Sequence, residues 1–212
     1  MKAIMISIKP KYVVDILNGR KTIEIRKTCP KCELPIDVYI YCSKGNKKNW
    51  HLIEVVDTDT GCESYEYDYY IGSKGYLDWC LDGKVVAKFT LNEVEEIAYE
   101  CGNNGISDNG YKWFYTEKLD LVQDFEKACC LNSEELYYYL KPREAKGKTC
   151  GYAWHIDNLV IFDKPKELSY FNSYTCKNYK TKKCEQCRNS GITKICYKKL
   201  TRPFQSWGYV EE

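Results

Sequence analysis

Four side chains of different chemistry lie close together near the start of the chain. Lys21, Thr22, Glu24 and Arg26 supply an ammonium, a hydroxyl, a carboxylate and a guanidinium just after Gly19. Arginine forms a fork that fits phosphate or carboxylate, lysine supplies a point charge, and a carboxylate accepts from an exocyclic amine of a base. The segment could therefore bind a phosphate or a polar base edge.

The same side chains also fit a structural role. Apolar and polar residues alternate from 21 to 27, which predicts a strand with one polar face. On an exposed strand, Glu24 and Arg26 would form an ion pair that contributes only about 0–1 kcal/mol. In an enzyme, by contrast, Lys21 would activate a nucleophile and Glu24 would transfer protons.

The surrounding elements predict a mixed α+β fold with a curved or closed sheet. Residues 3–8 alternate as a half-buried strand, residues 10–17 have the spacing of an amphipathic helix, and Gly19 stands where a left-handed cap belongs. The other expected elements are strands over residues 36–42, 83–91, 150–162 and 203–211, and a pair of helices within residues 118–140, the second capped at Ser133.

A long insertion is expected between two of these strands. Residues 1–165 form the predicted main domain, which residues 43–82 interrupt at the tip of a hairpin. An insertion of this length is either functional or partly mobile. Tyrosine is enriched in recognition surfaces, so the tyrosine-rich residues 63–76 could bind a protein partner.

Residues 166–202 are predicted to be a separate extension rich in lysine and cysteine, whose positive charge could contact phosphates. Four of its cysteines have the spacing C-x7-C-x2-C-x8-C and could hold a structural zinc ion, namely Cys176, Cys184, Cys187 and Cys196. Free thiols or a transient disulfide are the alternatives. The second C-x2-C, formed by Cys29 and Cys32, could contribute to a composite site.

Composition favours a cytoplasmic protein. The 13 cysteines are odd in number and no apolar leader precedes them, so we expect reduced thiols. No stretch approaches the roughly 18 apolar residues of a spanning helix, so we expect no membrane association. His51 and His155 are the two histidines, and no phosphate-loop or nucleophile-elbow pattern accompanies them.

Residues 19–26, Gly-Arg-Lys-Thr-Ile-Glu-Ile-Arg, resemble the signature of the ASCH domain family in the PUA-like superfamily. In that family the pattern Gly-x-Lys-Thr-x-x-x-Arg lies at the junction between a helix and a strand. Gly19, Lys21, Thr22 and Arg26 match it position by position. Residues 151–155 also resemble a later strand of the family.

The resemblance implies a small PUA-like β-barrel with a helix after the first strand, a cleft beside that helix, and a closing strand over residues 203–212. It also implies binding of RNA, DNA or a modified nucleotide. Together with local chemistry, it gives the expected ligand-binding residues Lys9, Lys21, Thr22, Glu24, Arg26, Trp154, His155, Gln205 and Trp207. Because neighbouring strand residues face opposite ways, only one of Trp154 and His155 is expected to enter the cleft. The alternative is a structural role, with the tryptophan buried in the barrel core.

Some compact relatives resemble amidohydrolases of acylated cytidine nucleosides that use a lysine, a threonine two residues after the motif threonine, and a distant glutamate. Lys21 matches this set, whereas Glu24 occupies the threonine position. We therefore expect a binding protein first, with hydrolysis of acylated nucleosides as the alternative and partner binding through the tyrosine-rich insertion as the second alternative.

Overall fold

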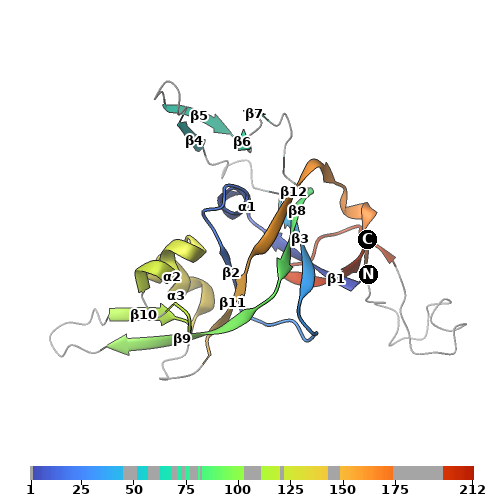
Figure 1. The fold of residues 1–212 in the computed structure, drawn as a ribbon. Helices are drawn as coiled ribbons and strands as arrows, with labels where there is room; N and C mark the ends of the chain where they lie inside the picture. Colours follow the sequence, from blue (N-terminus) through green and yellow to red (C-terminus); the bar gives the residue numbers. More distant parts are fainter. Residues whose placement is uncertain are drawn as a thin grey trace, which may run out of the picture. The chain divides into compact units, whose positions relative to one another are not determined.

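The computed structural model describes residues 2–44, 52–56, 63–67, 71–72, 75–76, 81, 83–102, 111–119, 122–142, 149–173 and 198–212. Strands dominate and helices are few, so the mixed α+β class predicted from sequence is confirmed (Figure 1). The chain divides into two compact units. The first contains Met1–Val14, Ile36–Phe89 and Leu159–Glu212, and the second contains Asp15–Pro35 and Thr90–Asn158.

Most of the first unit is built on a curled sheet of 7 strands. In order across the sheet these are β12 (Asp157–Lys166), β8 (Val85–Leu91), β3 (Ile36–Cys42), β1 (Lys2–Ile8), β15 (Trp207–Glu211), β13 (Asn172–Ser173) and β14 (Lys198–Lys199). β1 pairs in parallel with β3 and antiparallel with β15. The last strand of the chain therefore lies beside the first.

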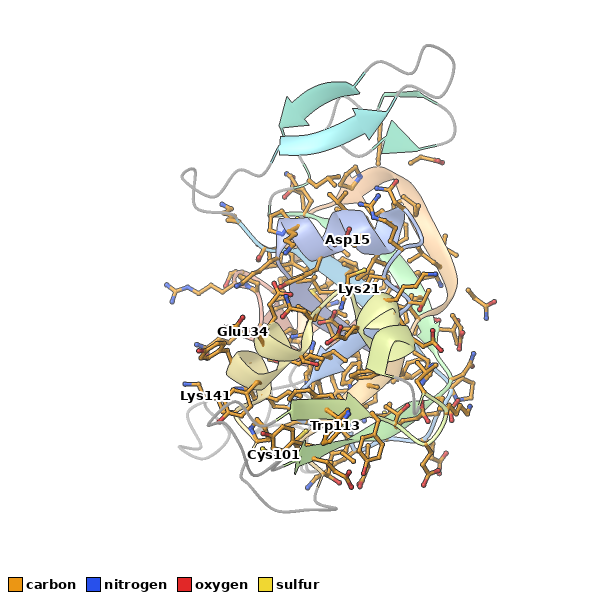
Figure 2. All side chains as sticks on the ribbon, turned by 90° about the vertical axis from the view of Figure 1, so that its left-hand side faces the viewer. Asp15, Lys21, Cys101, Trp113, Glu134 and Lys141 are labelled. Carbon is orange, nitrogen blue, oxygen red and sulfur yellow. The ribbon has the colours of Figure 1, made fainter. Side chains whose placement is uncertain are left out.

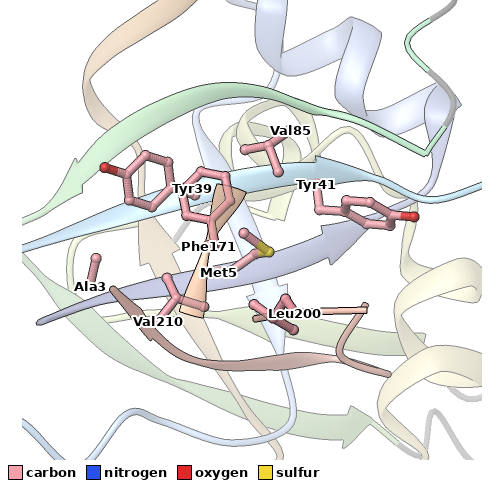
Figure 3. Close-up of a cluster of buried hydrophobic side chains, with 8 residues drawn as sticks. All are labelled: Ala3, Met5, Tyr39, Tyr41, Val85, Phe171, Leu200 and Val210. Atoms are coloured by element: carbon pink, nitrogen blue, oxygen red, sulfur yellow. The ribbon is translucent and has the colours of Figure 1, made fainter. Parts of the chain in front are cut away.

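β1 is buried on both faces. The prediction of a half-buried strand is wrong, because Met5 and Ile6, which face opposite ways, are both fully buried. One face belongs to the cluster of apolar side chains shown in Figure 3, which comprises Ala3, Met5, Tyr39, Tyr41, Val85, Phe171, Leu200 and Val210. Because each of these side chains is removed from water, the cluster is a main source of stability for this unit.

Helix α1 (Pro10–Leu17) follows β1 as predicted. Proline is favourable at the first helical position because its missing N–H has no partner there in any case. Gly19 has a φ of 71° and donates its backbone N–H to the Ile16 carbonyl at 2.9 Å. The left-handed glycine cap is therefore confirmed, and it turns the chain toward the next strand.

The second unit contains an antiparallel sheet of 4 strands. Its order is β10 (Tyr111–Tyr115), β9 (Val94–Gly102), β11 (Gly151–His155) and β2 (Ile23–Arg26), and the same unit holds helices α2 (Val122–Cys129) and α3 (Ser133–Leu140). β9 and β10 were not predicted from the sequence. In β9, glutamates interrupt the alternation of apolar and polar residues.

The cap of α3 lies one residue before the predicted position. The Asn132 side chain accepts from the Glu135 N–H at 2.8 Å, and the Glu135 carboxylate accepts from the Asn132 N–H at 3.1 Å, which forms a capping box. The Ser133 hydroxyl donates instead to the Glu126 carboxylate at 2.5 Å. Ser133 therefore links α3 to α2 and does not cap the helix.

Residues 43–82 include two short hairpins. β4 (Leu52–Val56) pairs with β5 (Glu63–Tyr67), and β6 (Ile71–Gly72) pairs with β7 (Gly75–Tyr76). A short 3-10 helix covers Leu168–Tyr170. Within the described residues, no helix has both the length and the apolar character needed to cross a membrane.

A side chain at Gly208 of β15 is expected to clash with the ring of Phe204. A Cβ atom there would lie 2.3 Å from Cε1 of Phe204, whose ring packs against the apolar cluster of Figure 3. Gly208→Ala should therefore lower the free energy of unfolding by about 1–3 kcal/mol, measured by urea denaturation. In a Phe204→Leu background the same substitution should cost less, and an equal cost in both backgrounds would contradict the steric explanation.

Candidate functional site

Backbone hydrogen bonds hold Lys21 and Thr22, the residues just before β2, in place. Within the second unit, the Lys21 N–H donates to the Asp15 carbonyl at 3.0 Å and the Thr22 N–H donates to the Ala128 carbonyl at 2.9 Å. The Thr22 carbonyl accepts from the Ile156 N–H at 3.0 Å. These bonds set the position of Lys21 just before β2 begins.

Lys21, Glu24 and Arg26 form one connected set, which we call the Glu24 cluster. The Lys21 Nζ lies 3.4 Å from Glu24 Oε2, and the Arg26 Nη2 lies 3.0 Å from Glu24 Oε1. Each carboxylate oxygen thus faces a different cation. The expected ion pair between Glu24 and Arg26 is therefore confirmed. All three residues are buried, so the expectation that this pair lies on an exposed strand is wrong.

Lys21 also completes the end of α2. Its Nζ donates to the Cys129 carbonyl at 2.5 Å, and Lys21 itself is only 2% exposed (labelled in Figure 2). Carbonyls in the last turn of a helix have no partner within the helix, and they carry the negative end of its dipole. A buried ammonium at this place therefore satisfies the helix end and the Glu24 carboxylate together.

The Glu24 cluster reaches the surface at Tyr139 of α3. The Arg26 guanidinium hydrogen-bonds the Tyr139 hydroxyl. Burial raises the pKa of Tyr139, and the positive charge of Arg26 offsets part of that rise. The Tyr139 residue is nevertheless 39% exposed, and the Lys27 Nζ lies 5.3 Å from its ring centroid. An aromatic ring and a cation thus lie at the outer end of a buried ionic network.

Trp154 and His155 occupy opposite faces of β11. Trp154 pairs in register with Glu24 and is fully buried, so it belongs to the face of the Glu24 cluster. On the other face, the His155 Nε2 lies 2.6 Å from Glu95 Oε2. The two side chains therefore point to opposite faces of the sheet, as expected, and Trp154 shares a face with Glu24.

The pair formed by Glu95 and His155 was missed by sequence reasoning. Glu95 is buried on β9, and its second oxygen accepts from the Lys118 N–H at 3.1 Å. In the sequence, Glu95 is a charged residue beside Val94, and β9, to which both belong, was not predicted. A buried carboxylate that holds one imidazole nitrogen fixes the orientation of the ring.

The remaining expected ligand residues are distributed over both units. Thr22 is exposed in the second unit, beside the buried Lys21. Lys9 and Gln205 are exposed and Trp207 is partly buried, and all three belong to the first unit. The structure therefore brings together Lys21, Glu24, Arg26 and Trp154.

The expected zinc ligands Cys176, Cys184, Cys187 and Cys196 lie outside the described residues. Cys29 and Cys32 are partly buried free thiols. Burial raises the pKa of the Cys29 thiol, and the neighbouring Cys32 adds to that rise. In the part of the chain that the structure describes, no three histidine, cysteine or acidic side chains are grouped as metal ligands.

No family model matches the chain, and neither a curated protein nor a solved structure matches it. The resemblance to the ASCH family therefore stays a prediction that rests on residues 19–26 and 151–155. What the chain does must be argued from its own geometry.

Lys21→Met should strongly destabilise the protein. It removes one of the two cations from a buried carboxylate and the side-chain donor from the Cys129 carbonyl, and breaking a buried pair in this way costs about 3–5 kcal/mol. Urea denaturation measures the loss. Arg20→Met is the matched control, because the Arg20–Asp15 pair has an arginine side chain that is 58% exposed, and its loss should cost about 0–1 kcal/mol.

The pairing itself is tested by combining Lys21→Met with Glu24→Gln. Because the two groups interact directly, the double substitution should cost clearly less than the sum of the single ones. Strictly additive costs would contradict the buried pair.

Proposed function

We propose that the protein is a nucleic-acid-binding or modified-nucleotide-binding module of the ASCH, PUA-like type, and that its ligand binds where the Glu24 cluster meets the surface. The observation that carries this proposal is the connection from buried Lys21 and Arg26 to exposed Tyr139 and Lys27. Residues 21–27 contain three cations and one carboxylate. Such an excess of positive charge favours a phosphate-bearing ligand.

The three cations differ in burial, and their proposed roles differ accordingly. Lys21 and Arg26 are almost fully removed from solvent, so their proposed role is to hold Glu24 and Tyr139 in place. Lys27 and Thr22 are exposed at the two ends of β2. Direct contact with a phosphate is therefore assigned to Lys27, and Thr22 is a separate polar group at the opposite end of the strand.

Hydrolysis of acylated nucleosides has less support. A general base must reach the proton that it abstracts, whereas each Glu24 oxygen is engaged by Lys21 or Arg26. The alternative of binding a protein partner rests on residues 63–76, and the structure does not describe their side chains. The geometry of the Glu24 cluster therefore favours binding over proton transfer.

Binding should be sensitive to salt and to Lys27. We expect labelled single-stranded RNA to bind the full chain, and the affinity to fall between about 50 and 200 mM salt as counterions are released. Lys27→Glu should weaken binding and reduce the salt slope by about one. Fluorescence anisotropy measures both.

Lys127→Glu is the control for this measurement. It makes the same charge change at an exposed position of α2 and should have a much smaller effect. Absence of binding to any nucleic acid or nucleotide at low salt would refute the proposed function.

We also propose that the cysteine-rich extension binds zinc through Cys176, Cys184, Cys187 and Cys196, on the support of their spacing. Native mass spectrometry should then find about one zinc ion per chain. Cys184→Ser should release it, whereas Cys101→Ser, at a free cysteine of β9, should leave the metal content unchanged. Metal-free wild-type protein purified without chelators would count against the site.

A further inference from the structure

Tyr139 is presented to solvent from a well-anchored helix. Leu136 and Leu140 of α3 are buried, and the capping box formed by Asn132 and Glu135 fixes its start. The Tyr139 hydroxyl is held by Arg26 while the residue remains 39% exposed. The ring is therefore tied at its hydroxyl and keeps an accessible surface.

Lys27 gives this ring a charged neighbour. Its Nζ lies 5.3 Å from the ring centroid, and Lys27 follows the last residue of β2 directly. Proteins that bind single strands combine aromatic rings, on which bases stack, with cations that follow the phosphates. The spacing between Lys27 and Tyr139 provides one element of each kind.

We propose that Tyr139 stacks on one unpaired base of a single-stranded nucleic acid, while Lys27 pairs with the adjacent phosphate. Arg26 acts as a positioning residue that holds the Tyr139 hydroxyl. The inference rests on the proposed function and narrows its ligand to a single strand, because a base inside a duplex is already stacked on both sides and offers only its edges.

Tyr170 of the first unit is a natural comparison. It is also exposed, at 60%, and the Lys166 Nζ lies 5.1 Å from its ring centroid. However, Lys166 is paired with the Glu212 carboxylate, so its charge is neutralised. Tyr170 thus shares the ring and the neighbouring lysine, but that lysine is already held by a carboxylate.

The experiment compares two ligands that differ only in their bases. Fluorescence anisotropy of the full chain would be measured with oligo-dT of about twelve nucleotides and with an abasic phosphodiester strand of the same length, since such sites cover about 4–16 nucleotides. Tyr139→Ala should weaken oligo-dT binding at least about fivefold and change abasic binding less than about twofold. Tyr139→Phe should weaken oligo-dT binding less than Tyr139→Ala does, because the ring remains while the hydroxyl that Arg26 positions is lost.

Two controls separate stacking from loss of structure. Tyr139→Leu keeps apolar bulk without an aromatic face, and it should behave like Tyr139→Ala while the thermal midpoint stays close to that of Tyr139→Phe. Tyr170→Ala should leave both affinities unchanged. Ultraviolet cross-linking of wild-type protein to bromouridine-containing RNA should label Tyr139.

The outcomes distinguish this inference from the proposed function. Salt-sensitive oligo-dT binding that depends on Lys27 but is unaffected by Tyr139→Ala would overturn the stacking role and leave the proposed function intact. Equal weakening of oligo-dT and abasic binding, or tighter binding of a duplex, would also overturn it. If wild-type protein binds no single strand, duplex or nucleotide, both proposals fall together.

Discussion

A buried carboxylate held between two cations is the constraint on which the second unit depends. Moving a charged group out of water costs several kcal/mol unless a partner of opposite charge and further hydrogen bonds replace the lost hydration. Glu24 meets this requirement because Lys21 and Arg26 face its two oxygens. Lys21 meets it through Glu24 and the Cys129 carbonyl. Shifting any one of these groups would leave another with an unfavourable buried charge.

This requirement ties together elements that are distant in sequence. Lys21 binds the end of α2, Arg26 holds a tyrosine of α3, and Glu24 lies in register with Trp154 of β11. The pairing therefore fixes how β2 sits against both helices of its own unit. The structural and the functional interpretations of the motif are compatible, because the side chains that organise the fold also determine where Tyr139 stands.

The sequence was most informative where structure is local. α1 and its cap could be predicted from Pro10, Gly19 and helical spacing, since those preferences act within a few residues. The burial of Glu24 could not be predicted, because alternation tells which residues share a face and says nothing about what covers that face. The Lys21 bond to Cys129 spans 108 residues, and no local pattern encodes such a contact.

Position 24 carries glutamate where the amidohydrolase pattern that residues 19–26 resemble has threonine, and this difference has a direct physical consequence. A threonine hydroxyl at position 24 would carry no charge to attract the Lys21 ammonium, whereas Glu24 places a carboxylate oxygen 3.4 Å from it. A lysine held by a carboxylate and a helix-end carbonyl serves as a fixed cation, and nucleophilic or basic chemistry would require it to give up those bonds. Lys21 and Lys27 are six positions apart but differ in their surroundings. Lys21 is buried against Glu24 and the end of α2, whereas Lys27 is exposed to solvent.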